Sequence, residues 1–134
     1  MADIGQLYSK KLIKHFRNPK NMGKIKNPDG VATLGNPVCG DVMRLFIKVG
    51  KKDGEEHIKD IKFQTLGCAA AIASSSMLTL MVKGKSLKEA EKISRKTIVE
   101  VLGGLPPQKI HCSVLAVDAL KKAIENYRKK KNEG

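Results

Sequence analysis

Three cysteines, a histidine and an aspartate are the residues of this chain that could bind a metal. They are Cys39, Asp41, Cys68, His111 and Cys112. Cys68 and Cys112 each stand where a helix is expected to begin, and helix N-termini favour negative charge, so the pKa values of both thiols should be lowered. Thiolate is the form of cysteine that binds metals. The set suits a zinc ion or an iron–sulfur cluster.

The spacing of these residues does not decide between a metal site and ordinary packing. There is no C-x-x-C pair, and the long gaps between the cysteines match no common metal-binding signature. Cys39 and Asp41 project to the same face if residues 39–41 are extended. For each cysteine the alternative is a packing thiol, since free Cys is among the most buried residue types. This alternative applies above all to Cys68, beside an Ala-rich helix, whereas His111 could simply bond to backbone at a helix start.

The elements that must position these residues follow an α+β pattern, with strands first and helices after. The hydrophobic periodicity and the turn residues predict a helix ending near 18–19, an irregular loop over 18–37 with a short strand at 31–34, strands over 42–49 and 58–66 joined by a hairpin loop at 50–54, and helices over 68–82, from 86, over 94–102 and from about 112. We therefore expect a small antiparallel sheet of about three strands with helices packed on it.

Local signals mark several helix ends. Ser86 and Glu89 form a capping box, and Ser94 begins a helix that Gly103 closes. The last helix carries one apolar stripe, made of Val114, Val117, Leu120, Ile124 and Tyr127. From residue 128 we expect it to fray into a basic tail ending at 134. His15 and His57 lie on charged segments and are expected to be surface residues without a role.

The size and charge of the chain restrict its class. With 134 residues, 1–134 is expected to form a single domain. The net charge of +13 suggests nucleic-acid binding, but the chain has few aromatic residues, and arginine occurs only at Arg17, Arg44, Arg95 and Arg128. The excess charge lies in residues 1–30, 83–96 and 121–134, away from the cysteines. We interpret it as a lysine-rich surface, part of which could dock an acidic partner, and expect no nucleic-acid function.

Targeting signals are not recognisable in the sequence. The first thirty residues contain no apolar run, and the longest apolar stretch, 68–82, is shorter than a membrane span. We expect no membrane association and a cytoplasmic location, where an odd number of cysteines argues against a disulfide framework.

Three sequence blocks around the cysteines resemble the IscU-type (NifU N-terminal-like) iron–sulfur cluster assembly scaffolds. They are Gly-Asn-Pro-Val-Cys-Gly-Asp at 35–41, Thr-Leu-Gly-Cys-Ala-Ala-Ala at 65–71, and Leu-Pro-Pro-Gln-Lys-Ile-His-Cys at 105–112. The blocks occur in the order of the family, and the resemblance extends over essentially the whole chain.

The resemblance implies a role for each candidate. Cys39, Cys68 and Cys112 match the three cysteines on which such scaffolds build a cluster, and Asp41 matches an aspartate implicated in iron entry and in keeping the cluster labile. His111 matches the histidine beside the third cysteine, which is typical of the IscU branch and not of the SufU branch. Either Asp41 or His111 could be the fourth ligand.

The loop before the third cysteine departs from the family pattern. Lys109 matches a lysine that can pair with the aspartate in the cluster-free site. The loop, which an Hsp70-type chaperone recognises in the family, comprises Leu105, Pro106, Pro107, Gln108 and Lys109. Gln108 stands where the family usually has Val, and a polar side chain there weakens the expectation of chaperone docking. Ala69 and Ala70 replace Gly and Ser after Cys68, which raises helix propensity there without removing a ligand.

The function implied is that of a scaffold and not of a turnover enzyme. An IscS/NifS-like cysteine desulfurase would deliver sulfur as a persulfide on Cys112, iron would join, and a 2Fe–2S cluster would form and pass to apo-proteins. Zinc is an expected occupant of the cluster-free form. The alternatives are a zinc-binding structural protein, a sulfur acceptor, or a Cys–His enzyme, for which His15 or His57 would have to serve as base without a supporting motif. Assembly into a homo-oligomer is left open.

Overall fold

A three-stranded antiparallel sheet forms one layer of the molecule. A computed structural model describes residues 10–36, 40–67, 69–103 and 110–133. The strands are β1 (Gly30–Asn36), β2 (Asp41–Lys52) and β3 (Glu55–Leu66), paired in the order β1-β2-β3. Both pairs are antiparallel, so the predicted α+β class and the three-stranded sheet are confirmed.

The hairpin between β2 and β3 is tighter than the predicted loop at 50–54. Pairing continues to Lys52 and Glu55, so that only Asp53 and Gly54 turn the chain, both with positive φ. Opposite charges face each other on the two strands, and such cross-strand pairs favour continued pairing. Gly50 also leaves room for the ring of His57, whose Cε1 would lie 2.9 Å from a Cβ at position 50.

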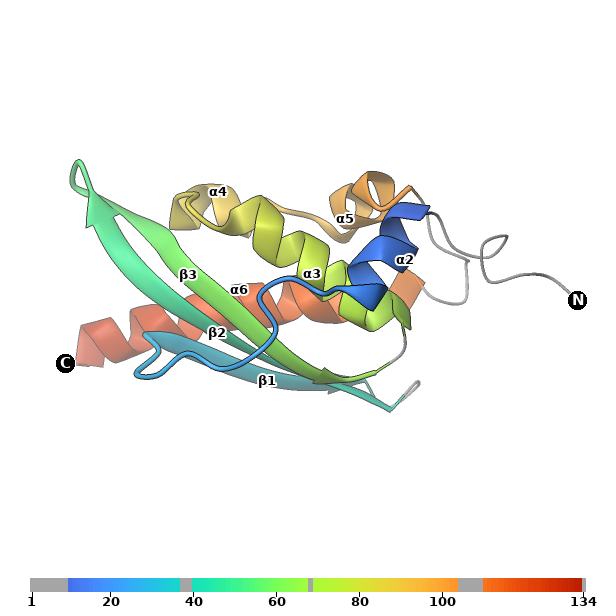
Figure 1. The fold of residues 1–134 in the computed structure, drawn as a ribbon. Coiled ribbons are helices and arrows are strands. Elements are labelled where there is room, and N and C mark those ends of the chain that lie inside the picture. Colours follow the sequence, from blue (N-terminus) through green and yellow to red (C-terminus); the bar gives the residue numbers. More distant parts are fainter. Residues whose placement is uncertain (1–9, 37–39, 68, 104–109, 134) are drawn as a thin grey trace, which may run out of the picture.

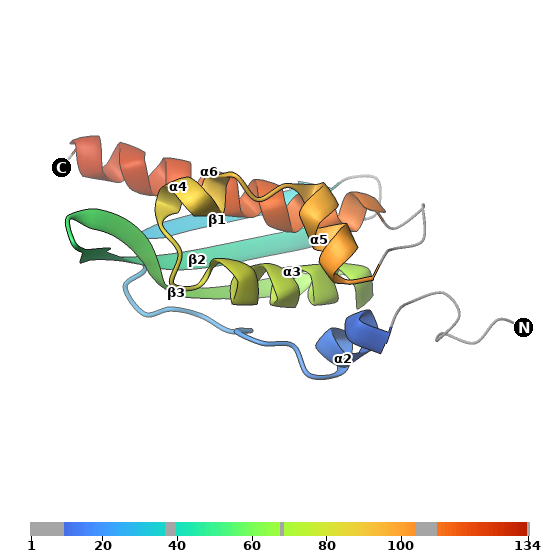
Figure 2. The same cartoon turned by 90° about the horizontal axis from the view of Figure 1, so that it is seen from above.

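Helices cover one face of this sheet. The helices are α2 (Lys10–Arg17), α3 (Ala69–Val82), α4 (Leu87–Glu91), α5 (Arg95–Val101) and α6 (Ile110–Glu133). α6 packs on β1 and β2, α3 packs on β3 and on α6, and α2 lies against the outer side of α3 (Figures 1 and 2). Within the described ranges, no helix combines the length and apolar character that a membrane crossing requires.

The strand alternation and the helix caps match the sequence predictions. On β2 the side chains of Met43, Leu45 and Ile47 are fully buried between sheet and helices. Ser86 Oγ accepts a hydrogen bond from the Glu89 amide at 3.1 Å, and Ser94 Oγ accepts one from the Thr97 amide at 3.3 Å, which caps α4 and α5. The apolar stripe of the last helix is buried at Val117, Leu120 and Ile124.

The predicted fraying of the last helix from residue 128 is wrong. α6 begins slightly earlier than predicted, at Ile110, and remains helical to Glu133. Its last turns are tied to neighbouring elements, because Arg128 pairs with Glu91 of α4 and Lys131 Nζ lies 3.3 Å from Glu56 Oε1 of β3. Tyr127 also donates a hydrogen bond to Glu56. These long-range partners stabilise a segment whose own composition favours solvation.

The prediction that His15 and His57 are surface residues without a role holds only in part, because both side chains are half-buried and His15 contacts a neighbouring helix. His15 Nδ1 lies 2.7 Å from Ser76 Oγ of α3, so the ring holds α2 against that helix. Burial, reinforced by Lys14, Lys20 and Lys11, lowers the pKa of His15. His57 packs against Gly50, and its Nδ1 is buried without a hydrogen-bond partner in the described part of the chain.

Candidate functional site

The first residues of β2 lie between the ends of the two neighbouring strands. Asn36 of β1 pairs with Asp41, and Val42 pairs with Leu66 of β3. Cys39 occurs in the sequence between Asn36 and Asp41, and Cys68 follows Gly67, but both cysteines lie outside the described residues. Their described chain neighbours therefore meet at one end of the sheet, which we call the site end.

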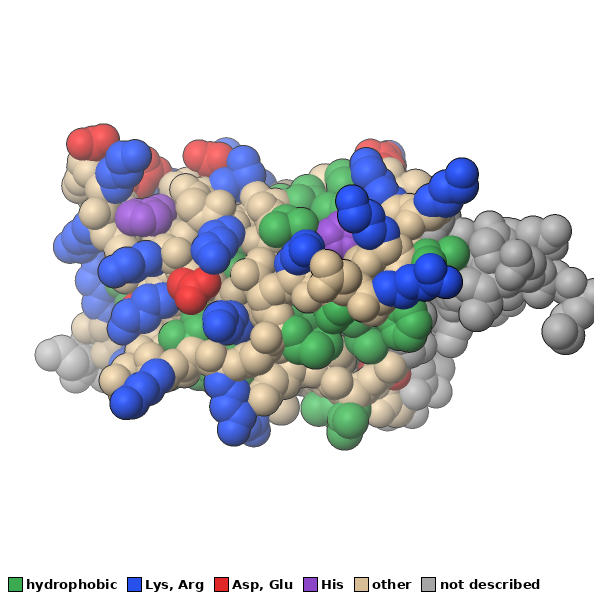
Figure 3. Space-filling view, in the orientation of Figure 1, with side chains coloured by type: hydrophobic (Ala, Val, Ile, Leu, Met, Phe, Trp, Pro, Cys, Tyr) green, Lys and Arg blue, Asp and Glu red, His purple; other side chains and the backbone are tan. Residues whose placement is uncertain are grey.

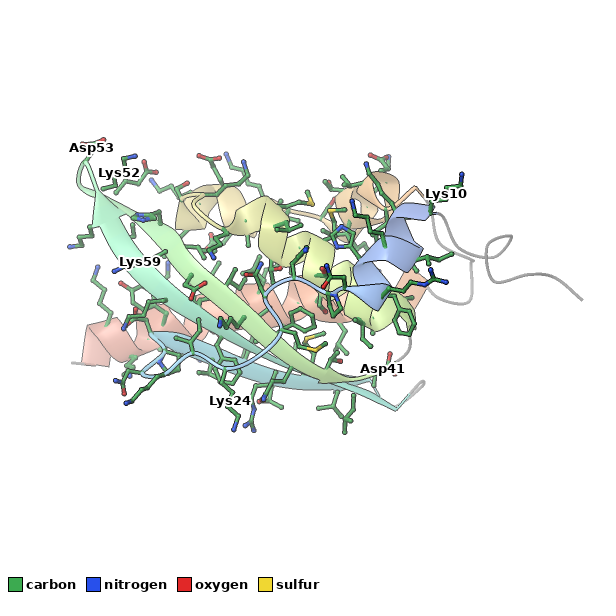
Figure 4. The ribbon with its side chains drawn as sticks, viewed as in Figure 1. Lys10, Lys24, Asp41, Lys52, Asp53 and Lys59 are labelled. Carbon is green, nitrogen blue, oxygen red and sulfur yellow. The ribbon has the colours of Figure 1, made fainter. Side chains whose placement is uncertain are left out.

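The Asp41 carboxylate is buried against Gly67 at this site end. Asp41 is only 5% exposed, and a Cβ added to Gly67 would lie 3.0 Å from its Cγ and 3.2 Å from its Oδ2. Figure 4 labels Asp41 at the end of the sheet. The carboxylate thus occupies the space that a side chain at position 67 would need, directly beside the residue that precedes Cys68. A buried carboxylate at this place can serve as a hard oxygen ligand.

The first turn of α6 reaches the same end. Asn126 Nδ2 donates to the Val31 carbonyl at 2.9 Å, and a Cβ on Gly30 would overlap the Ala123 carbonyl oxygen, so the end of α6 lies along the start of β1. α6 runs back along β1 from there, which puts its beginning where β1 ends (Figures 1 and 2). His111 and Cys112 belong to this first turn.

Two helix N-termini face the site end. α3 begins at Ala69 and α6 at Ile110, and the unsatisfied amides and dipoles of helix starts stabilise negative charge. A cysteine at a helix start is in general favoured as the thiolate for this reason. Soft thiolates beside a hard oxygen donor fit iron bound with sulfide, and they also fit zinc.

The structure therefore brings some, but not all, of the predicted residues together. Asp41 and the backbone of His111 and Cys112 lie at the site end. The predicted supporting residue Lys109 and the loop 105–108 lie outside the described residues, as do Cys39 and Cys68. The ligand set remains a prediction.

Sequence reasoning missed two positioning features. The first is Gly67, whose lack of a side chain admits the Asp41 carboxylate. The second is a set of buried hydroxyl groups on α3. Ser76 Oγ forms a hydrogen bond with His15 and accepts another from the Lys20 amide at 2.8 Å. Thr79 Oγ1 accepts a hydrogen bond from the Asn21 side chain at 3.0 Å. Serines and threonine within an otherwise apolar helix were the available signal, since buried hydroxyls require partners.

The NifU-like N terminal domain model matches residues 7–134 of the chain. The chain belongs to this family. A protein of Archaeoglobus fulgidus named iron-sulfur cluster assembly scaffold protein IscU 1 is 60% identical over 124 residues, covering 92% of this chain and 78% of that protein. The iron-sulfur cluster assembly scaffold protein IscU of Azotobacter vinelandii is 53% identical over 127 residues, covering 92% of this chain and 96% of that protein. These relatives confirm the predicted IscU-type membership.

The solved structures agree with this family. The putative SUF-system scaffold protein of Fervidobacterium islandicum superposes with a TM-score of 0.70 at 26% identity, covering 91% of this chain and 99% of that one. A NifU-like protein from Brucella abortus superposes equally well, with a TM-score of 0.70 at 22% identity, which bears on the fold alone. The NifU-like arrangement of sheet and helices predicted from the sequence is thus confirmed.

Proposed function

We propose that this protein is a scaffold on which an iron–sulfur cluster is assembled and from which the cluster passes to apo-proteins. Two supports are the family and the names of its relatives. The observation that carries the proposal is the buried Asp41 carboxylate, packed on Gly67 at the end of the sheet where α6 also starts. That arrangement supports Asp41 as a hard ligand, because its carboxylate lies close to described chain neighbours of the cysteines.

An incomplete ligand set explains why a cluster held here would be transient. The resident clusters of ferredoxins are held by four cysteine thiolates. Here Cys39, Cys68 and Cys112 supply three, and either Asp41 or His111 supplies the fourth position of a 2Fe–2S cluster. An oxygen or imidazole ligand exchanges more readily than a cysteine thiolate bound to iron, so this position of the cluster opens first. An incoming thiolate of an acceptor protein can then replace it.

Sulfur would arrive as a persulfide from a cysteine desulfurase. The Cys112 thiolate attacks the terminal sulfur of the desulfurase persulfide, the S–S bond to the desulfurase breaks, and the desulfurase leaves as a thiolate. The helix start at Ile110 favours the attacking thiolate. Two electrons from a thiol or ferredoxin-type reductant then convert the transferred sulfur to sulfide, which combines with iron.

Anaerobic reconstitution tests this function. The protein is incubated with ferrous iron, cysteine, a cysteine desulfurase and dithiothreitol, and the visible spectrum is followed. We expect a cluster chromophore in the wild type and none in the Cys39→Ala/Cys68→Ala/Cys112→Ala variant. A wild type that remains colourless would refute the proposal.

Metal exchange distinguishes a scaffold from the alternative, a structural zinc protein. A structural zinc site would resist replacement by iron and sulfide, and removal of zinc would unfold the chain. For a scaffold we expect zinc, where present, to be displaced during reconstitution while the circular dichroism of the fold is retained.

A further inference from the structure

The basic charge of the molecule is unevenly compensated. In the basic segments 83–96 and 121–134, some cations pair with nearby acids, as in Lys85–Glu89, Lys129–Glu125 and the pair of Arg128 with Glu91, whereas others of these segments form no ion pair within the described ranges. The N-terminal helix differs, because its sequence from Lys10 to Arg17 contains no acidic residue.

Five exposed cations gather on and directly after α2. We call this surface the α2 patch, and it consists of Lys10, Lys11, Lys14, Arg17 and Lys20. None of the five forms an ion pair with any residue in the described ranges. Figure 3 shows blue side chains gathered over α2 around a histidine, with hydrophobic side chains below them. The cations act on their surroundings, since three of them contribute to the lowered pKa of His15.

An aromatic side chain lies within this patch. Phe16 is 44% exposed and stands between Lys14 and Arg17 in the helix, whereas Leu12 on the preceding turn is completely buried. An exposed aromatic side chain on a helix that also carries several exposed cations fits a protein interface with an apolar anchor and a polar rim. Arg17 can in addition bind a carboxylate through two hydrogen bonds.

Other anionic partners fit the patch less well. A membrane-surface helix inserts its apolar face, but the apolar face of α2 is packed on α3 through Leu12 and the His15–Ser76 bond. Single-stranded nucleic acid requires several aromatic side chains for stacking, and α2 offers only Phe16. Carboxylates on a folded protein need neither an inserting face nor a stacking platform.

The patch lies close to the site end. α2 packs on α3, whose beginning follows Gly67, and α2 lies toward the end of the molecule where Asp41 is found (Figures 1 and 4). A short helix with a few cations supports only a small, charge-rich interface, which is typical of transient encounters. A recipient of cluster must dissociate after each transfer, so a transient contact suits it.

We propose that the α2 patch, with Phe16 as its apolar anchor, docks an acidic surface of the apo-protein that receives the cluster. This inference rests on the proposed scaffold function. Electrostatic attraction steers the recipient to the site end, and its effect lies mainly in the association rate and in the salt dependence of binding.

The test uses an acidic apo-ferredoxin of the 2Fe–2S type as the probe. Binding of the fluorescently labelled apo-ferredoxin to the cluster-free protein is measured between about 50 and 300 mM salt. The Lys11→Gln/Lys14→Gln/Arg17→Gln variant should bind roughly tenfold more weakly at low salt and show a flatter salt dependence. Phe16→Ala should weaken binding without changing the salt dependence.

A matched control removes the same charge elsewhere. Lys88, Lys92 and Lys96 are exposed and form no ion pair in the described part of the chain, so their replacement by Gln lowers the net charge equally. We expect this control to bind apo-ferredoxin as the wild type does. Equal losses in both triple variants would show a net-charge effect and overturn the proposal, as would no loss in either.

Two further measurements keep the outcomes distinct. If a 20-base-pair duplex DNA binds through the α2 patch and displaces apo-ferredoxin, the patch serves a nucleic acid and the proposal fails. Cluster assembly from iron and inorganic sulfide is measured separately, and the α2 patch variant should assemble as much cluster as the wild type. A wild type that assembles none contradicts the scaffold function, whereas the binding comparison with cluster-free protein still decides the docking surface.

Discussion

A methyl group at position 67 should displace the Asp41 carboxylate. In Gly67→Ala the new Cβ would lie 3.0 Å from Asp41 Cγ, 3.2 Å from Oδ2 and 3.0 Å from the Ala71 Cβ. Favourable contacts between carbon atoms lie at about 3.5–4.0 Å, so the contacts with Asp41 Cγ and Ala71 Cβ are too close. Because Ala71 is fully buried within α3, the carboxylate is the group that can move.

Two opposing effects set how much Gly67→Ala changes the free energy of unfolding. Overpacking of this kind costs about 1–3 kcal/mol. Loss of glycine freedom in the unfolded chain returns about 0.4–1 kcal/mol. The φ angle of Gly67 is not among the positive ones, so the backbone itself accepts alanine. Gly35→Ala is the matched control, since its Cβ would meet the Asp41 carbonyl oxygen at an ordinary 3.7 Å.

Urea unfolding measures the difference. We expect the free energy of unfolding of Gly67→Ala to be about 1–3 kcal/mol lower than that of Gly35→Ala. When Asp41 is already replaced by Ala, the destabilisation caused by Gly67→Ala should be smaller by about 1 kcal/mol or more. Equal stabilities of the two alanine variants, together with no coupling to Asp41, would refute the described position of the carboxylate.

Three other predictions concern the surrounding fold. Burial and nearby lysines lower the pKa of His15 on folding, so the stability that neutral His15 contributes is present above the unfolded pKa of about 6.5 and is lost as pH falls below it. His15→Gln should therefore flatten the loss of urea stability between pH 7.5 and 5.5, and an unchanged slope would contradict the burial of His15. Burial and the hydrogen bond to Glu56 raise the pKa of Tyr127 to about 12, so stability should fall as pH rises from about 10 towards 12. In a Tyr8→Phe background, where Tyr127 is the one tyrosine left, Glu56→Gln should lower the midpoint of the tyrosine absorbance titration, and a midpoint near 10 without that substitution would contradict this. Gly30→Ala should force α6 away from β1 because its Cβ overlaps the Ala123 carbonyl, with a loss of roughly 3 kcal/mol or more in urea unfolding; a loss no larger than that of Gly35→Ala would show that the two elements are not in close contact.

Most elements of the fold could be predicted because their signals are local. The alternation in β2 and the serine caps of α4 and α5 are written in adjacent residues and appear in the structure as expected. The end of α6 could not be predicted, because Arg128 and Lys131 are held by Glu91 and Glu56, which are distant in sequence.

The same distinction applies to the candidate site. Asp41 was identified from the motif that contains it, but its burial depends on Gly67, which β2–β3 pairing brings beside it. The partnership of His15 with Ser76 is likewise a contact between separate elements. Motifs name the residues of a site, whereas their environment arises from tertiary packing.

Cluster transfer is the most direct test of the scaffold function. The reconstituted protein is mixed anaerobically with apo-ferredoxin, and visible circular dichroism follows the movement of the cluster from one protein to the other. We predict transfer of the cluster from the wild-type protein to apo-ferredoxin. A cluster that stays on the wild-type protein in the presence of excess apo-ferredoxin would contradict the account, since the site would then hold a resident cluster and not a cargo.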